Sequence, residues 1–185
     1  RLTLLCDICG TPAGVGFAAG ARALLLNDVH ASRNVTWIFD YDADEGTLSN
    51  RRVFRDGSLA DDPGCPAGLA LDSEGGVWTA RWNGGTLLRH EPSAGGIAAR
   101  VPLPVRRPTA LCFGGENLAD LFVATAGGHR RPADGVQAGA LFRLRGLPCR
   151  GLPPHVSRLG RAAAAQHAFA QAGEAAADEE RTRKA

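Results

Sequence analysis

The 185-residue sequence contains no methionine. A newly translated chain begins with methionine, so we expect the sequence to be a fragment, a processed chain or a gene model cut at its 5′ end. The length fits one domain, with room for a tail. A domain of this size buries about 70% of the surface of its unfolded chain, so a true hydrophobic core is expected.

Long apolar runs and aromatic residues are also scarce. Aromatic residues make up 6% of the sequence, and the longest apolar run, residues 23–26, is only as long as a strand. We therefore expect no transmembrane helix and no membrane partner. No charged-then-apolar leader follows Arg1, so no signal peptide is visible. The compartment stays open, with a cytoplasmic location slightly favoured. The 24 glycines and 11 prolines argue against a helical bundle or a coiled coil.

The sequence also has no large excess of positive or negative residues. The 21 basic and 19 acidic residues give a net charge of +2, which excludes the basic field of a nucleic-acid-binding protein. All basic residues but Lys184 are arginines, and their scattered positions indicate a solvated rim. The five cysteines are odd in number and irregularly spaced, unlike a disulfide framework. Cys6 and Cys9 form a C-x-x-C pair without further ligands, so unpaired thiols are favoured over a metal or redox site.

A repeat of short apolar segments runs through the middle of the chain. Its three copies begin with the paired segments 15–18 and 23–28, 69–72 and 75–80, and 111–114 and 120–125. Each copy ends in a third apolar strand, at residues 35–39, 86–89 and 140–144. Short strands that recur with a period near 40 to 45 residues are typical of β-propeller blades. We therefore predict an all-β fold with three consecutive blades.

The repeat stops near residue 156. Residues 157–185 contain 11 alanines, a composition that favours helix, but Gly173 interrupts the segment and its apolar stripe is weak. We therefore predict three parts: an unassigned segment at 1–10, a partial β-propeller at 11–156, and an Ala-rich helical or disordered tail at 157–185.

Several ordered motifs between residues 11 and 153 resemble one family. They are FDYD at 39–42, GTLSNRRVF at 46–54, GLALDSEGGVW at 68–78, LPVRRPT at 103–109, CFGG at 112–115 and GALF at 139–142. Together they are similar to the gluconolactonase, regucalcin and senescence-marker-protein family. The resemblance implies a six-bladed lactonase-type β-propeller with a divalent metal, calcium or zinc, at its axis. It also implies either hydrolysis of sugar lactones or calcium-binding regulation. Six such blades need about 270 residues, so we expect a C-terminal half of about three blades.

The same resemblance implies two metal-ligand positions within this chain. The asparagine of an N-G segment corresponds to Ala13, and the aspartate of a P-D-G triplet corresponds to Ala67. A methyl group supplies neither an oxygen ligand for calcium nor a base for a water molecule. We therefore expect that no metal ligand of the family is retained and that the metal is not bound. Asp61 and Asp62 would become substitutes only if a loop shift brought them to the channel. The family's glutamate ligand and its substrate-binding arginine and asparagine have no counterpart here.

Asp40, Asp42 and Asp44 imitate the spacing of an EF-hand loop. Glu45 stands where such a loop needs glycine, and Arg51 stands where it needs glutamate, so a strand end followed by a turn is favoured.

Two functions stay open. The first is a lactone hydrolase, of the carboxylic-ester hydrolase class, whose activity depends on residues absent from this sequence. The second is a non-catalytic propeller that acts as a binding surface. The expected partner is a small-molecule lactone. Because three blades cannot close a ring of six, self-association through open propeller edges is also expected.

Overall fold

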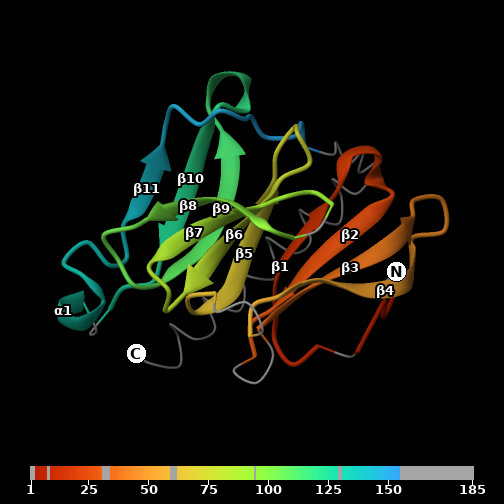
Figure 1. The fold of residues 1–185 in the computed structure, drawn as a ribbon, viewed down its shortest axis with the longest axis horizontal. Helices are drawn as coiled ribbons and strands as arrows, with labels where there is room; N and C mark the ends of the chain where they lie inside the picture. Colours follow the sequence, from red (N-terminus) through yellow and green to blue (C-terminus); the bar gives the residue numbers. More distant parts are fainter. Residues whose placement is uncertain are drawn as a thin grey trace, which may run out of the picture. The chain divides into compact units, whose positions relative to one another are not determined.

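The structure, a computed structural model, describes residues 3–7, 9–30, 34–58, 62–93, 95–128 and 131–154. Nearly all regular structure in these ranges is β, arranged in three antiparallel sheets that we call blades 1, 2 and 3 (Figure 1). No helix in them is long and apolar enough to cross a membrane. The predicted all-β fold is confirmed. The chain divides into units 1–153 and 154–185; the predicted Ala-rich tail at 157–185 lies outside the described residues.

Within each blade the strands lie side by side in the order of the sequence. Blade 1 consists of β1 (Pro12–Phe17), β2 (Ala23–Asp28), β3 (Val35–Asp42) and β4 (Thr47–Asp56). Blade 2 consists of β5 (Cys65–Leu71), β6 (Val77–Trp82), β7 (Thr86–His90) and β8 (Ile97–Pro102). Blade 3 consists of β9 (Pro108–Gly114), β10 (Asp120–Thr125) and β11 (Leu141–Leu144). The connections contain the short helices η1 (Ala19–Ala21), η2 (Glu116–Leu118) and α1 (Arg131–Asp134).

All strands predicted from the repeat are present, and blades 1 and 2 each gain a fourth strand. These outer strands, β4 and β8, have largely exposed or alternating burial patterns. An outer strand packs on little apolar surface, so its sequence shows no strong apolar signal. Prolines bound the connector between blades 2 and 3, since β8 ends at Pro102 and β9 begins at Pro108.

Asp72 stabilises the turn between β5 and β6. Its fully buried carboxylate accepts hydrogen bonds from the Gly76 amide at 2.8 Å, the Trp78 indole at 2.9 Å and Arg89 Nε at 2.7 Å. Burial alone would raise the pKa of Asp72, but the hydrogen bonds from Arg89, Trp78 and Gly76 outweigh it and hold the pKa below its usual value. This buried network fixes the glycine-rich turn between the two strands.

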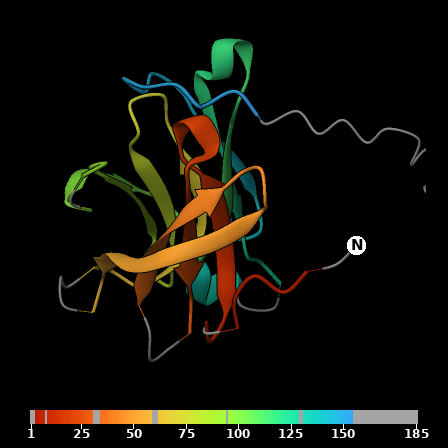
Figure 2. The ribbon, with the colours of Figure 1, turned by 90° about the vertical axis from the view of Figure 1, so that its right-hand side faces the viewer.

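The first strands of the blades, which we call inner strands, contact one another. β1 lies against β5, and β5 lies against β9 (Figures 1 and 2). Glycine permits this approach at two places. A Cβ on Gly14 would lie 2.5 Å from the Ala67 carbonyl oxygen, and a Cβ on Gly68 would lie 2.6 Å from Ala110 Cα. Because backbone atoms occupy the space, a side chain at either position would push the blades apart.

The hydrophobic core consists of two clusters, one on each side of blade 2. Side chains that alternate along β5 point to opposite faces of the sheet. Leu69 and Leu71 join the cluster shared with blade 1, whereas Ala70 between them packs against the cluster shared with blade 3. Ala67 also joins the cluster shared with blade 3, because the break in pairing between Pro66 and Leu69 takes it out of the regular alternation. The cluster with blade 1 contains Leu25, Leu69, Leu71 and Val77. The cluster with blade 3 contains Ala67, Trp78, Ala80, Leu87, Leu111, Leu121, Val123 and Cys149.

Replacing Gly68 with alanine tests this packing. We expect Gly68→Ala to lower the free energy of unfolding by about 3 kcal/mol, because the new methyl group meets backbone atoms of β9 that cannot move aside. Gly20→Ala is the matched control: Gly20 has a φ of +77° but no atom within 4 Å of a Cβ, so only about 1 kcal/mol of backbone strain is expected. Denaturant unfolding of both variants measures the difference. Equal losses would contradict the close approach of β5 and β9.

Candidate functional site

Each inner strand begins with an irregularity in its pairing with the next strand. The register of β1 skips Ala13, and the register of β9 skips Thr109. In β5 the pairing breaks between Pro66 and Leu69, a stretch that includes Ala67. Such bulges redirect a side chain away from the regular pleat and often occur beside functional sites. The three blades therefore present Ala13, Ala67 and Thr109 at equivalent positions.

These three residues lie at one end of three adjacent inner strands, and we call them the inner-strand site. The contact of Gly14 with the Ala67 carbonyl brings the first two bulges together. A Cβ on Gly68 would lie 2.8 Å from the Thr109 carbonyl oxygen, so the third bulge adjoins the second. Ala13 is exposed, Ala67 is buried and Thr109 is half-buried. The structure thus brings together the two alanines singled out in the sequence and adds Thr109, which the sequence analysis missed.

A sequence signal for Thr109 exists. Pro-Ala-Gly occurs at 12–14 and again at 66–68, and Pro-Thr-Ala occupies the corresponding place at 108–110. Each proline begins or nearly begins an inner strand, where a missing backbone N–H is tolerated.

Polar side chains next to the inner-strand site are engaged within the protein. Asn27 is fully buried: its Nδ2 donates to the Ala67 carbonyl at 2.6 Å, and its Oδ1 accepts from the Thr36 hydroxyl at 2.7 Å. The carboxylate of Asp28 is also buried and accepts from the Gly10 and Thr11 amides, at 2.9 and 2.8 Å. These bonds fix the chain that enters β1 and orient both alanine bulges.

Asp62, a proposed substitute ligand, forms a bidentate ion pair with Arg55. Arg55 Nε and Nη2 lie 3.0 and 2.8 Å from the two carboxylate oxygens, and the Asp62 side chain is fully buried. Burial alone would raise the pKa of Asp62, but the hydrogen bonds and charge of Arg55, with the charge of Arg81, hold it below the usual value. Arg55 therefore engages both oxygens of this carboxylate. Asp61, the other proposed substitute, lies outside the described residues.

Arg81 corrects the expectation that the arginines occupy a solvated rim. It is 1% exposed and donates through Nε to the Pro63 carbonyl at 3.0 Å. Its Nη2 donates to the Gly64 carbonyl at 2.8 Å and to Asn34 Oδ1 at 2.7 Å. Burial lowers the pKa of Arg81 to about 10, so the guanidinium is still charged at neutral pH. The guanidinium of Arg81 thus holds the chain that leads to Ala67. Its buried positive charge makes the binding of a second cation nearby less favourable, because like charges repel.

The described residues do not fit a divalent metal at the inner-strand site. Calcium takes six to eight oxygen ligands and zinc takes nitrogen, sulfur or carboxylate ligands. Ala13 and Ala67 offer methyl groups, and Thr109 offers one hydroxyl. Nowhere in the described part of the chain do three or more His, Cys, Asp or Glu side chains gather as a metal site.

The acidic run at 40–44 forms a strand end and a turn, as predicted. Asp40 accepts from Arg52 at 2.6 Å and from Asn50 at 2.8 Å. Asp42 Oδ1 accepts from the amides of Asp44 and Glu45 at 2.9 and 3.1 Å, which closes the turn after β3.

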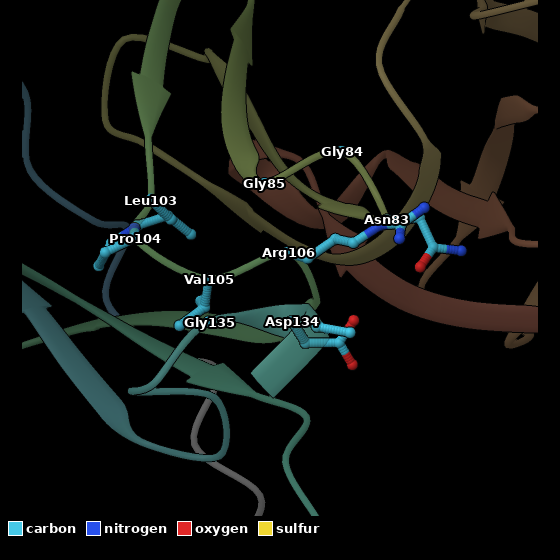
Figure 3. A pocket seen from close by; sticks show the side chains of 10 residues that line it. Asn83, Gly84, Gly85, Leu103, Pro104, Val105, Arg106, Asp134 and Gly135 are labelled. Atoms are coloured by element: carbon cyan, nitrogen blue, oxygen red, sulfur yellow. The ribbon is translucent and has the colours of Figure 1, made fainter. Parts of the chain in front are cut away.

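A groove of about 450 Å³ opens at the same end of blades 2 and 3 as Ala67 (Figure 3). Its walls are the β6–β7 turn at residues 83–85, the connector 103–106 and the end of α1 with Asp134. Arg107 joins two of these walls, since its Nε donates to Asn83 Oδ1 at 2.9 Å and its Nη1 lies 3.3 Å from Asp134 Oδ2. The groove is shallow, and Asn83, Arg106 and Asp134 are the polar side chains in its lining.

Three antiparallel blades that meet through their inner strands define a β-propeller-type protein, and comparisons with known proteins agree. The family described as the SMP-30/Gluconolactonase/LRE-like region matches residues 1–127. The chain belongs to this family.

Individual relatives match a part of their own length. Regucalcin of Danio rerio is 39% identical over 120 residues, which cover 63% of this chain and 40% of the relative. Human regucalcin is 37% identical over 122 residues, with the same coverage. The structure of a calcium-binding regucalcin from Agrobacterium tumefaciens matches with a TM-score of 0.75 and 26% identity, over 86% of this chain and 53% of that protein. A luciferin-regenerating enzyme matches in fold with a TM-score of 0.73 and 24% identity, over 82% and 50% of the two chains. The chain thus spans about half or less of the relatives that it matches.

His90 lies in the interface between blades 1 and 2 and is fully buried. Its Nδ1 donates to the Gly95 carbonyl at 3.1 Å, so Nε2, 3.2 Å from the Thr79 hydroxyl, accepts. Burial lowers the pKa of His90 to about 4, and the imidazole is neutral in the folded protein.

This buried imidazole predicts a pH-dependent stability. The unfolded chain binds a proton at His90 near pH 6.5, whereas the folded chain does so only near pH 4. Stability from this group is therefore complete above pH 6.5 and falls as the pH drops from 6.5 to 4, by about 3 kcal/mol. We expect His90→Gln to flatten the unfolding free energy over this range, measured by denaturant titrations at several pH values. An unchanged slope in the variant would show that other groups cause the loss.

Proposed function

We propose that this chain is a ligand-binding half-propeller that takes part in the sugar-lactone chemistry of its family without hydrolysing the lactone through its own residues. The observation that carries the proposal is alanine at both inner-strand bulges, Ala13 and Ala67. The bulges would aim functional side chains at a bound molecule, but these two carry only methyl groups.

Hydrolysis of a lactone makes demands that the inner-strand site does not meet. A divalent metal, where bound, polarises the carbonyl and lowers the pKa of a water molecule. A nearby carboxylate then accepts the proton of that water. The hydroxyl of Thr109 is neither a base near neutral pH nor a sufficient ligand set. The carboxylates of Asp28 and Asp62 are held by backbone amides and by Arg55, respectively.

Binding a lactone without hydrolysing it requires only hydrogen-bond donors and acceptors. The groove between blades 2 and 3 has such groups. The carboxamide of Asn83 and the carboxylate of Asp134 line the groove. The guanidinium of Arg107, outside the lining, joins them into one connected set of donors and acceptors. A sugar lactone carries several hydroxyl groups and a carbonyl, which match such a set. The small-molecule partner that we propose is therefore a sugar lactone, bound at this end of the blades.

A lactone hydrolase with bound calcium or zinc is the second candidate. Family membership favours it, and the similar protein from Agrobacterium tumefaciens is described as calcium-binding. In this chain, such an activity would require oxygen ligands from outside the described residues.

Metal titration separates the two candidates. We expect calorimetric titration of the chain with calcium or zinc to give no saturable binding at micromolar concentrations. The double variant Ala13→Asn/Ala67→Asp should gain at most calcium binding weaker than about 10⁻³ M, because two new side chains supply fewer than the six to eight oxygen ligands that calcium takes. The matched control Ala43→Asn/Ala98→Asp places the same side chains on exposed positions away from the inner-strand site and should gain nothing.

Two results would support the hydrolase instead. One is micromolar metal binding by the unchanged chain that Asp62→Asn abolishes. The other is metal-dependent hydrolysis of gluconolactone above the rate in buffer. Binding of gluconolactone without turnover, weakened at least tenfold by Asn83→Ala, would support the proposed function.

A further inference from the structure

Blade 3 is one strand short in the part of the chain that the structure describes. Blades 1 and 2 each end in an outer fourth strand, whereas β11 pairs with β10 alone. Its other edge presents unpaired backbone groups, and Leu141 on this strand is 70% exposed. An edge of this kind readily pairs with a further strand.

The N-terminal segment, Thr3–Asp7, belongs to no helix or strand and pairs with no strand in the described structure. Leu4 is 78% exposed and Leu5 is 46% exposed. Figure 2 shows this segment leaving the start of β1 and running away from the strands. An apolar, unpaired segment therefore lies before blade 1, and an unpaired strand edge lies on blade 3 of the described structure.

The spacing of the blades identifies the structural role of the N-terminal segment. Connectors 57–64 and 103–107 each join the outer strand of one blade to the inner strand of the next. The same spacing before Pro12 places the end of an outer strand between residues 3 and 6. The first residues of the segment thus lie where a fourth strand of a preceding blade would end.

The direction of the N-terminal segment also fits. β10 ends beside Pro108, at the end of the blades that holds the inner-strand site, so antiparallel β11 begins there and runs away from it. The N-terminal segment runs toward that same end, since it leads into Pro12. Paired with β11, it would be antiparallel, as β4 is to β3 and β8 is to β7.

We propose that two copies of this chain close head to tail around a twofold axis, with Thr3–Asp7 of each copy pairing with β11 of the other. Each copy would then complete the partner's blade 3 to four strands and cover the open side of the partner's blade 1. A head-to-tail contact between copies builds an open filament unless the copies close into a ring. Two copies of a half-ring close after two such contacts.

Two further observations favour a second copy as the occupant. The chain covers 50% and 53% of two solved structures with the same fold, so two copies supply as much chain as one complete relative. The large exposed apolar side chains also lie only in the terminal regions of the described chain: Leu4, Leu5, Val15 and Val53 in or before blade 1, and Val136 and Leu141 in blade 3. Blade 2, which is covered on both faces, has none among its described residues.

Sedimentation velocity of the 185-residue chain over a range of concentrations tests the proposal. We expect a dimer, with slow hydrogen exchange at residues 3–7 and 141–144. Leu4→Pro/Leu5→Pro should raise the dimer dissociation constant at least tenfold, because proline removes the N–H groups that the pairing needs. These residues pair with no strand of their own copy, so the variant should keep its fold by circular dichroism. Leu141→Lys should weaken the dimer as well.

Ala98→Lys is the control for added charge, since it changes an exposed residue of β8, a strand outside the proposed interface. It should leave the dimer intact. A monomer at all concentrations with fast exchange at residues 3–7 would overturn the proposal and favour blades of a longer chain as the natural cover of these surfaces. A dimer unaffected by the proline variant, or open-ended oligomers, would overturn it equally.

Discussion

The close approach of neighbouring inner strands is the constraint on which the rest of the structure depends. Gly14 lies against the backbone around Ala67, and Gly68 lies against Ala110, so no side chain separates the blades there. This contact aligns the bulges of three blades at one end. It also lets the two apolar clusters form on both faces of blade 2. The position of the inner-strand site and the packing of the core therefore have the same origin.

Charge next to the inner-strand site is balanced within the protein. Arg55 neutralises Asp62, and the buried guanidinium of Arg81 binds backbone carbonyls of the chain that leads to Ala67. Removing one member of a buried ion pair is costly, often 3–5 kcal/mol, because the other charge stays buried. These side chains therefore fix the geometry of the site and are poorly suited to leave their partners for a metal.

The strands with apolar signals could be predicted from the sequence, and the outer strands could not. β5 and β6 are buried on both faces and have nearly continuous small or apolar side chains, whereas β4 carries polar groups such as Arg51 and Arg52. The motifs also predict that Ala13 and Ala67 stand at ligand positions of the family, and this assignment stays a prediction. The proximity of these two alanines, the equivalence of Thr109 and the burial of Arg81 depend on contacts between distant segments, which no local pattern specifies.

The central claim of the proposed function is that the described blades keep the fold of the family but provide no metal site. The most direct test is the metal content of the chain, purified from medium with calcium and zinc, exchanged into metal-free buffer and measured by elemental analysis. The account predicts far less than one equivalent of either metal. One equivalent of calcium or zinc bound per chain, retained through the exchange, would contradict it.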